Sequence, residues 1–440
     1  MALQPVQVSE VRANTSATHA LFPPGQLAPF ILVTFLFFLW GIPNSMNDVL
    51  IRQFMKSFEL TRFQAGLVQS AFYMGYFTLA IPAALLMKKS GYKSGFITGL
   101  LLLSAGAFLF WPAAIFQRFG FFLVALFVMA SGLSFLETAS NPFIAQLGDP
   151  VSSERRLNFS QAFNPLGNIT AALVGTVFIL SGVELSKGDI AARVANHTYQ
   201  SYLQFETLRV VRPYLVIAAV AFAWAGLIWR TKFPVIQSEV EHGGEHGKFS
   251  ELLRERHFVL AVIAQFFYVG AQVCSWSYLI SYAQEYAHFP EKRAGLLLAG
   301  NFAMFGIGRF ASAYVMGYFS PAKLMGSYGV INVLLLLVAI FHPGTAGMWC
   351  VFLTSLFMSV MFPTIFALGL KGLGPNTKIG GSLLVMAIVG GAVLTPVMGL
   401  ISERLHSLAL GYLVPLFAYF FILSYSFWGS ERKAVATAVS

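Results

Sequence analysis

The residues LFFLWGIPNSMNDVL, at positions 36–50, combine the pattern of a membrane span with amide and carboxylate side chains. The stretch begins as an apolar run suited to lipid and then places Asn44, Asn47 and Asp48 where a membrane helix would normally stay apolar. A carboxylate inside a membrane span is unfavourable by roughly 2.5–3.5 kcal/mol, and such residues face a water-filled cavity or a partner. The three polar residues are spaced i, i+3 and i+4, so they share one helix face. Two interpretations are open: a polar cluster that joins two helices, or part of a transport pathway.

The composition predicts a membrane protein with many spans and small loops. Hydrophobic residues make up 57% of the 440-residue chain and charged residues 10%, whereas soluble domains carry about 25% charged residues. The net charge of +10 does not indicate a nucleic-acid partner, because the basic residues lie at the ends of apolar runs. Cys274 and Cys350 lie within apolar runs and predict neither a disulfide framework nor a metal site. The N-terminal region lacks the pattern of a cleavable signal.

Apolar runs of about 20 residues are long enough to cross a bilayer, and the chain contains twelve of them. Each is expected to be an α-helix, because a segment in lipid must satisfy its own backbone hydrogen bonds. The predicted spans are 28–52, 64–87, 94–116, 119–146, 157–181, 212–231, 257–285, 293–319, 322–341, 346–371, 378–401 and 408–428. A polar insertion, 186–212, separates the fifth span from the sixth.

The longest break between apolar runs divides the chain into two halves of six spans. This break contains His242 and His246, but nothing completes a ligand set for a metal, so it is expected to be a solvated linker. Similar motifs follow the second and eighth spans, GYK at 91–93 and GYFSPAK at 317–323, which indicates related halves. Related halves are typical of transporters with a substrate site between them near the midplane. The predicted domains are a tail, 1–27, a first half, 28–231, a linker, 232–256, and a second half with its tail, 257–440.

The distribution of Lys and Arg predicts the orientation. If the N-terminus is cytoplasmic, the inside segments carry sixteen basic residues and the outside loops ten, with Arg52 and Arg309 lying inside spans. Both termini are therefore expected in the cytoplasm.

Several further spans carry polar residues along one helical face. Amide side chains both donate and accept hydrogen bonds, and an aromatic ring supplies a flat apolar wall, so together they suit a sugar. The alternative is that the amides only join helices. The candidate residues are Asn44, Asn47 and Asp48 in span one, Glu137 and Asn141 in span four, Gln161 and Asn164 with Asn158 and Asn168 in span five, Gln265, Tyr268, Gln272 and Trp276 in span seven, and Asn301 in span eight.

Other residues in the second half are candidates for gating or for structure. Arg309 lies within span eight and needs a partner, for which Glu403 or helix-end carbonyls are available. Gly390 and Gly391 permit close helix approach, and Pro363 interrupts a helical ladder and marks a bend. Simple packing is at least as good an interpretation of the glycines and the proline, and contact with substrate is the alternative for Arg309.

These motifs resemble those of the L-fucose:proton symporters of the major facilitator superfamily. The stretches that carry the resemblance include residues 36–50, FQAGLVQSAFY at 63–73, LETASNPF at 136–143, QFFYVGAQ at 265–272 and PTIF at 363–366. The resemblance implies an all-α membrane protein with twelve transmembrane helices in two pseudo-symmetric halves. It implies a proton-coupled symporter of L-fucose, or of glucose, galactose or N-acetylglucosamine, that works by alternating access. It also implies that Asp48 and Glu137 are the protonatable residues and that Gln161 and Asn164 contact sugar.

Departures from the pattern of the L-fucose carriers lie at Ser45, Met361 and Phe362, where that pattern has asparagine, glutamine and tyrosine. These changes remove hydrogen-bonding groups and leave the identity of the sugar open. A transport-inactive sugar sensor is the alternative from another class. An enzyme is not expected, because no nucleophile–base pair, zinc motif or nucleotide loop lies in the spans. We expect a monomer in the bacterial inner membrane, with a monosaccharide and protons as its ligands, no cofactor and no nucleic-acid partner.

Overall fold

The computed structural model describes residues 25–148, 153–234, 249–316, 318–373 and 376–430. Within these ranges every regular element is a helix, and twelve helical stretches are long and apolar enough to cross a membrane. The predicted all-α fold with twelve spans is therefore confirmed. Most of the predicted N-terminal tail, the part of the linker that holds its two histidines and the end of the C-terminal tail lie outside the described residues.

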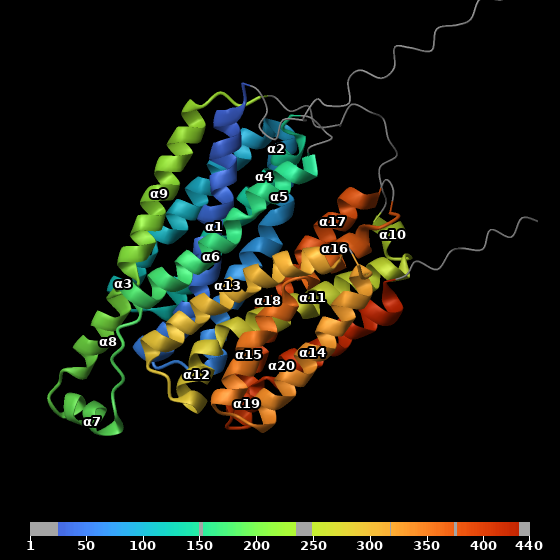
Figure 1. The fold of residues 1–440 in the computed structure, drawn as a ribbon. Coiled ribbons are helices and arrows are strands. Elements are labelled where there is room, and N and C mark those ends of the chain that lie inside the picture. The colour runs from blue at the N-terminus through green and yellow to red at the C-terminus, as the bar shows by residue number, and fades with distance from the viewer. Residues whose placement is uncertain (1–24, 149–152, 235–248, 317, 374–375, 431–440) are drawn as a thin grey trace, which may run out of the picture.

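The first half consists of helices that run back and forth between the two ends of the molecule (Figure 1). Its elements are α1 (Leu27–Ser57), α2 (Arg62–Phe108), α3 (Phe110–Phe116), α4 (Phe119–Gln146), α5 (Ser153–Gln161), α6 (Phe163–Val174), the π-helical segment η2 (Gly175–Ile179), α7 (Lys187–Ala195), α8 (Tyr199–Leu208) and α9 (Val211–Arg230).

The second half repeats this arrangement. Its elements are α10 (Phe249–Leu252), α11 (Arg256–Ser277), α12 (Leu279–Ala287), α13 (Glu291–Val315), α14 (Pro321–Phe341), α15 (Thr345–Met358), α16 (Met361–Leu370), α17 (Thr377–Met386), the 3₁₀ turn η5 (Ala387–Val389), α18 (Gly390–Arg404), α19 (Leu408–Gly411), α20 (Leu413–Ser424) and the π-helical segment η6 (Tyr425–Gly429).

Local sequence signals set several helix boundaries. Thr61 and Gln64 form a capping box at the start of α2, in which each side chain accepts from the other residue's backbone N–H; this arrangement satisfies N–H groups that a helix start leaves unpaired. α2 includes both the second span and most of the third, with a kink at Gly91, where φ is +77°. A side chain is strained at such an angle and glycine is not, so Gly91 provides the turn between the two spans.

The sixth span begins earlier in the chain than predicted. The stretch that can cross a membrane begins at Tyr199 and includes α8, whereas the sequence predicted a polar insertion up to residue 212. Glu206 is the physical reason, because this charged residue of α8 is 1% exposed and accepts a hydrogen bond at 3.1 Å from Gln53 on α1. The charges of α8 are thus satisfied inside the molecule. In the same insertion, α7 has no buried residue.

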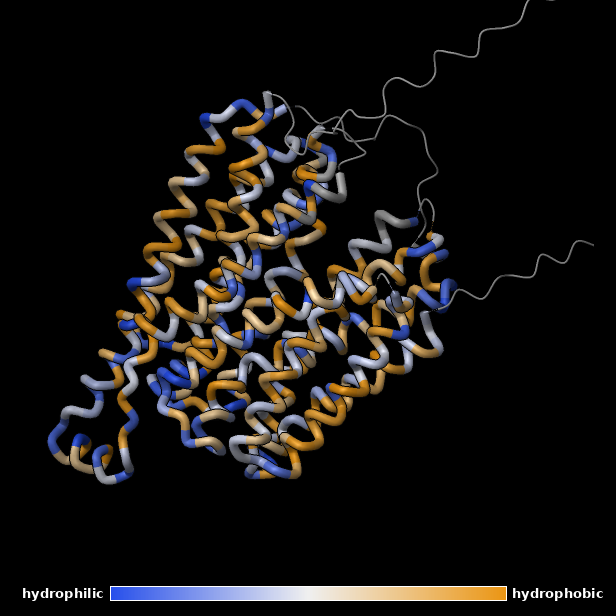
Figure 2. Tube along the Cα trace, viewed as in Figure 1, coloured by the Kyte–Doolittle hydropathy of each residue, from blue (hydrophilic) through white to orange (hydrophobic). Residues whose placement is uncertain are grey.

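The two halves pack through equivalent spans. α2 packs against α18, and α6 against α13, so the second and fifth spans of each half meet the fifth and second spans of the other. Figure 1 shows the halves converging near α8, α12 and α19 and diverging between α4 and α17. We call these the closed end and the open end. Figure 2 shows hydrophobic residues along the lengths of outer helices such as α9 and α14.

Small residues allow the close approach of the halves at the closed end. A Cβ on Gly66 of α2 would lie 2.7 Å from the Cα of Pro396, and one on Gly399 of α18 would lie 2.6 Å from the carbonyl carbon of Arg62. Both positions therefore require glycine while the two helices are in contact.

Candidate functional site

A cavity of about 460 Å³ lies between the two halves, on the side of the open end. This volume is within the range of about 300–1,000 Å³ found for small-molecule sites. Helices α2 and α4 line it from the first half, and α16 and α17 line it from the second. The lining residues are Tyr76, Ala80, Ile81, Ala84, Leu85, Ser134, Glu137, Thr138, Asn141, Pro142, Phe366, Gly381, Ser382, Val385 and Met386.

Glu137 is the carboxylate of this cavity. The Tyr76 hydroxyl on α2 donates a hydrogen bond to it, and Ser134, one turn earlier on α4, donates to the backbone carbonyl of Tyr76 at 3.3 Å. One turn later, Asn141 donates to the backbone carbonyl of Glu137 at 3.2 Å. The predicted polar face of span four is therefore present and partly satisfied by its own helix and by α2.

Span five supplies a second polar element beside this carboxylate. Gln161 Nε2 donates to Asn141 Oδ1 at 3.1 Å, so the side chains of α4 and α5 form a continuous chain of hydrogen-bonding groups that begins next to Glu137. Such a chain offers both donors and acceptors to a polyhydroxyl ligand. The structure thus brings together Glu137, Asn141 and Gln161, which the sequence placed on two different helices.

The other amides of span five contact span one. Asn164 Nδ2 donates to the backbone carbonyl of Phe37 at 3.3 Å, and Asn168 Nδ2 lies 3.5 Å from Asn164 Oδ1. A Cβ on Gly41 would lie 2.7 Å from the carbonyl oxygen of Asn164, which shows how closely α1 and α6 pack. Asn44, one turn beyond Gly41, is partly exposed. The side chain of Asn158 lies outside the described part of the chain.

The polar residues of spans seven and eight bond mainly to α15 of span ten. Trp276 Nε1 donates to Ser355 Oγ at 2.9 Å, and Ser355 Oγ donates to Asn301 Oδ1 at 2.7 Å. Gln272 Nε2 donates to the Tyr268 hydroxyl at 2.9 Å, and that hydroxyl donates to the backbone carbonyl of Met358 at 3.1 Å. In this conformation most of the hydrogen-bonding capacity of these residues serves helix packing.

Of the ten residues predicted to contact substrate, Asn141 lines the cavity and the other nine do not. Asn47 and Gln265 are both 0% exposed, neither lines the cavity, and their amide atoms have no hydrogen-bond partner in the described ranges. A buried amide without a partner is unfavourable, so these side chains are available to a group that enters in another conformation.

Asp48 lies in the interface between the halves and not at the cavity. It is 3% exposed, and its Oδ1 accepts hydrogen bonds from Gln69 Nε2 on α2 at 2.9 Å and from Ser277 Oγ on α11 at 2.8 Å. Asp48 is nine residues from the end of α1 at the closed end, whereas Glu137 is eighteen residues from the corresponding end of α4. At 1.5 Å per residue, the two carboxylates differ in depth by about 13 Å.

An ion-pair network joins the halves at the closed end. Glu291, the first residue of α13, is 0% exposed and accepts hydrogen bonds at 2.8 Å from Lys56 Nζ of α1 and from the backbone N–H of Gly182. Lys56 Nζ also lies 3.4 Å from Glu206 Oε2, and Arg52 Nε lies 3.8 Å from Glu291 Oε1. Charges buried this deeply are favourable only when paired, so the network depends on contact between the halves.

Further contacts across the same end reinforce it. The Glu184 carboxylate of the first half accepts from the backbone N–H of Glu291 at 2.8 Å and from Gln284 Nε2 at 2.7 Å. The Arg62 guanidinium pairs with Glu285 and donates to Ser402 Oγ at 2.9 Å.

Arg309 contacts a backbone carbonyl oxygen, which is one of the two kinds of partner expected for it. Glu403 was one candidate, and this expectation is wrong, because Glu403 accepts from the backbone N–H of Phe63 at 2.6 Å at the closed end. Arg309 Nε instead lies 3.5 Å from the carbonyl oxygen of Ser359, just after α15, and its guanidinium lies 4.9 Å from the centroid of the Phe305 ring. Pro363 has no N–H to donate to that carbonyl four residues earlier, so the proline leaves it available to Arg309.

Pro363 lies in the first turn of α16, after the break between α15 and α16 that interrupts span ten. Gly390 and Gly391 begin α18. A Cβ on Gly390 would lie 1.9 Å from the carbonyl oxygen of Phe266 on α11, and one on Gly391 would lie 2.8 Å from the Tyr73 ring of α2. Gly390 thus serves packing within the second half, and Gly391 serves contact between the halves.

Polar residues of these sites that the sequence pattern does not mark include Tyr76, Ser277, Glu206 and Glu291. Tyr76 and Ser277 lie in apolar spans, one turn or less from recognised motifs, and that proximity was the available signal. Glu206 and Glu291 lie in segments that were interpreted as loops, and nothing in the local sequence marks either as buried.

Comparisons with known proteins agree with this architecture. Residues 30–378 match the Major Facilitator Superfamily. The chain belongs to this superfamily. It is 45% identical over 407 residues to the L-fucose-proton symporter of Escherichia coli K12, with coverage of 90% of this chain and 92% of that protein. It is 34% identical over 401 residues to the glucose/galactose transporter of Brucella abortus 9-941, with coverage of 91% and 93%.

A solved structure of this superfamily shares the fold. The transporter FucP, crystallised in the outward conformation, superposes with a TM-score of 0.68 at 43% identity, with coverage of 92% of this chain and 99% of that one. The chain is therefore a multi-pass membrane transporter and not an enzyme. In the part of the chain that the structure describes, no group of three or more His, Cys, Asp or Glu side chains could hold a metal ion.

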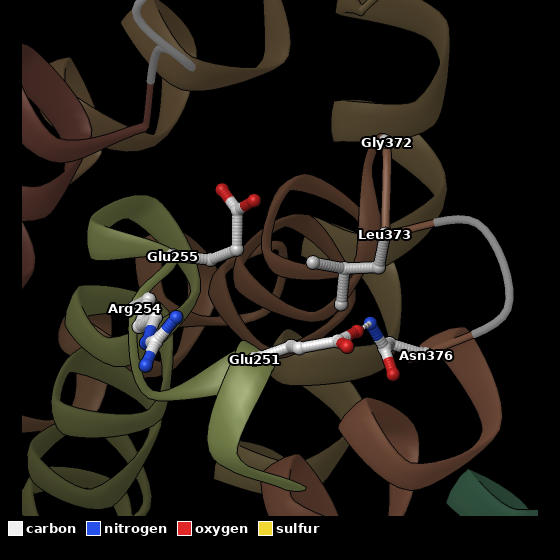
Figure 3. A pocket seen from close by; sticks show the side chains of 6 residues that line it. All are labelled: Glu251, Arg254, Glu255, Gly372, Leu373 and Asn376. Atoms are coloured by element: carbon white, nitrogen blue, oxygen red, sulfur yellow. Dashed lines mark hydrogen bonds between the residues drawn. The ribbon is translucent and has the colours of Figure 1, made fainter. Parts of the chain in front are cut away.

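A second, smaller hollow, of about 320 Å³, lies in the second half of the protein, at the open end. Figure 3 shows Glu251 and Asn376 facing one another in it, with Arg254 and Glu255 beside them. Asn376 donates to the Glu251 carboxylate at 3.0 Å. This bond joins α10 to the start of α17 outside the membrane spans, so the hollow is separate from the cavity between the halves.

Proposed function

We propose that this protein is a proton-coupled symporter that imports L-fucose or a closely related monosaccharide by alternating access. The observation that carries the proposal is the cavity between the halves, where Glu137 lies beside the hydrogen-bonded amides of Asn141 and Gln161. The name of the 45% identical relative, an L-fucose-proton symporter, supports the choice of sugar and of coupling ion. Protons are the only coupling species that the proposal requires.

Glu137 is the sugar-linked carboxylate in this proposal. A protonated carboxyl group both donates and accepts, whereas the anion only accepts. Proton uptake at Glu137 therefore changes which sugar hydroxyls it can bind, and this links the affinity for sugar to the proton. Gln161 and Asn164 provide sugar contacts from the neighbouring span.

Asp48 is the proton carrier. It is buried in the interface between the halves, nearer the closed end than Glu137 is. An uncompensated charge is unfavourable in a desolvated site, so the halves reorient most easily past this site when the carboxyl group is neutral or fully hydrogen bonded. The protein carries sugar and proton inward together. Symport results if it returns to the outward-facing state only after Asp48 has released its proton.

The orientation and boundaries complete the proposal. The bias of basic residues supports cytoplasmic termini, with residues 28–231 and 257–440 as the two halves, 232–256 as a cytoplasmic linker and the bacterial inner membrane as the location. The open end then faces the cytoplasm, and the cavity is in the conformation that releases sugar inward. We expect the protein to act as a monomer.

Glucose and galactose are the alternative substrates. Two observations favour them: the 34% identical glucose/galactose transporter, and the apolar Met361 and Phe362 where the L-fucose carriers have hydrogen-bonding side chains. Phe362 stacks on Phe366 with ring centroids 6.2 Å apart, and Phe366 lines the cavity.

The test is transport by the purified protein in proteoliposomes, with an inward proton gradient and a panel of L-fucose, D-glucose, D-galactose, N-acetylglucosamine and one amino acid. We expect uphill uptake of L-fucose together with alkalinisation of the external medium, and loss of accumulation when a protonophore is added. Accumulation of glucose or galactose instead would correct the sugar. Binding without transport of any sugar would support the sensor alternative, and uptake of the amino acid alone would exclude the proposal.

A further inference from the structure

The Asp48 carboxylate is held by two neutral donors that come from different halves. Gln69 Nε2 donates to Asp48 Oδ1 at 2.9 Å and Ser277 Oγ donates to the same oxygen at 2.8 Å. Gln69 Nε2 also donates to Ser277 Oγ at 2.9 Å, so the three side chains form a closed triangle of hydrogen bonds. Gln69 belongs to the same half as Asp48, and Ser277 is separated from Asp48 by 229 positions, on the last turn of α11.

The triangle is sealed from solvent and contains a single ionisable group. Asp48 is 3% exposed, and Gln69 and Ser277 are each 1% exposed. Among the described residues, no ion pair includes Asp48, and Tyr73 on α2 is the ionisable side chain that interacts electrostatically with it. In the closed-end network, Arg52 lies one turn from Asp48 on α1, with its Nε 3.8 Å from Glu291 Oε1, and Lys56, Glu206 and Glu291 pair with one another at the end of α1, two turns from Asp48. The donors are therefore the main groups that stabilise a charge on this carboxylate.

We propose that Ser277 and Gln69 are positioning residues that tie the charge of Asp48 to contact between the halves. The inference rests on the proposed role of Asp48 as the proton carrier. A hydrogen bond to a carboxylate is roughly twice as strong as one between neutral groups, so the anion gains more than the neutral acid from both donors. Because Ser277 belongs to the opposite half, separating the halves at this end removes its hydrogen bond.

A coupling between the proton and the conformation follows from this geometry. A ligand, here the proton, shifts the equilibrium between two conformations only by as much as its affinity differs between them. The Ser277 hydroxyl provides such a difference, because it reaches Asp48 only when the halves are in contact. When the halves are in contact at the closed end, the triangle favours the anion and release of the proton. When they separate there, the carboxylate loses its cross-half donor, and proton uptake is favoured on the side to which that end opens.

The experiment compares variants of the full-length protein in proteoliposomes, with L-fucose as the probe, or D-galactose if that sugar is the one taken up. The readouts are the external pH at which uphill uptake is half-maximal and the rate of counterflow. Loss of one hydrogen bond to a charged group changes a proton equilibrium by about tenfold. We therefore expect Ser277→Ala to move the midpoint by about one unit towards alkaline pH, because the anion of the closed conformation loses a donor and competes less with proton uptake from outside, and to keep counterflow within about twofold.

Matched variants separate positioning from packing. Ser277→Thr keeps the hydroxyl and should restore the wild-type midpoint. Ser275→Ala removes a serine on the same helix that is equally buried but donates only to the carbonyl of Ala271 in its own helix, and it should leave the midpoint unchanged. Gln69→Leu removes the second donor and should also shift the midpoint to alkaline pH, which keeps the test decisive if Ser277→Ala fails to fold.

Asp48→Asn distinguishes failure of this inference from failure of the proposed function. If Asp48→Asn retains uphill uptake, Asp48 is not the carrier and the proposed function must be revised. If Asp48→Asn abolishes uphill uptake while Ser277→Ala and Gln69→Leu keep the wild-type midpoint, Asp48 remains the carrier and the positioning role is overturned.

Discussion

The hydroxyl of Ser277 and the carboxylate of Asp48 lie 2.8 Å apart and belong to different halves of the transporter. Glu137, by contrast, lines the cavity on the side of the open end. The two buried carboxylates of the first half therefore have different surroundings in one conformation, because one is sealed in the interface and the other faces the cavity. This difference leads to separate predictions for each.

Replacing Asp48 with asparagine should abolish proton-driven accumulation of sugar and spare counterflow. Exchange across equal gradients needs no net proton movement, and asparagine retains an acceptor oxygen for Gln69 and Ser277. The measurement is uphill uptake beside counterflow in proteoliposomes, with the melting temperature as the control for folding. Loss of both activities together with a lowered melting temperature would indicate that Asp48 only braces α1.

Replacing Glu137 with glutamine should preserve sugar binding and remove its pH dependence. In the wild type, affinity should fall as the pH rises through the titration of Glu137, because only the neutral acid donates a hydrogen bond to the sugar. Glutamine donates at every pH and should give a flat profile. Equilibrium binding of radiolabelled sugar, measured at a series of pH values from mildly acidic to mildly alkaline, tests this. A pH dependence equal to that of the wild type would show that another group links sugar to proton.

Replacing Glu291 with alanine should weaken the closed end of the molecule. Breaking a buried ion pair by removing one partner costs about 3–5 kcal/mol. Because Lys56 keeps Glu206 at 3.4 Å, we expect about half of that, which is a change of about tenfold or more in the equilibrium between the two conformations. The measurement is the rate at which a maleimide modifies a cysteine introduced at Ser181, whose hydroxyl accepts from Lys56 Nζ. Arg293→Ala, at an exposed position in the first turn of α13, is the control and should leave that rate unchanged.

Replacing Gly66 with alanine should disfavour the same conformation through sterics alone. The added Cβ would lie 2.7 Å from the Cα of Pro396 in the other half, so the halves must move apart there while each half keeps its own packing. Gly226→Ala is the matched control, since nothing lies within 4 Å of the Cβ that it would add. We expect a slower transport cycle and a similar melting temperature for Gly66→Ala. Wild-type transport would show that the contact between α2 and α18 tolerates the extra methyl group.

The residue pattern of the chain predicts the class of fold and two polar residues of the cavity, Glu137 and Asn141. Long apolar runs in a chain with 10% charged residues have only helices as spanning structures, so the twelve spans could be predicted. Helical spacing places Glu137 next to Asn141, and the structure brings both beside Gln161.

Which helices meet follows from long-range packing and not from the pattern of any one span. Periodicity identifies the polar face of a helix, but it does not identify the distant residue that the face contacts. Ser277 meets Asp48 across 229 positions, and Glu291 is buried because Lys56 and the backbone of Gly182 neutralise and bind its carboxylate. A glutamate at a loop boundary is ordinarily solvated, and only packing against a distant partner makes its burial favourable. The contacts that close one end of the molecule therefore depend on long-range pairing, which no single stretch of the chain contains.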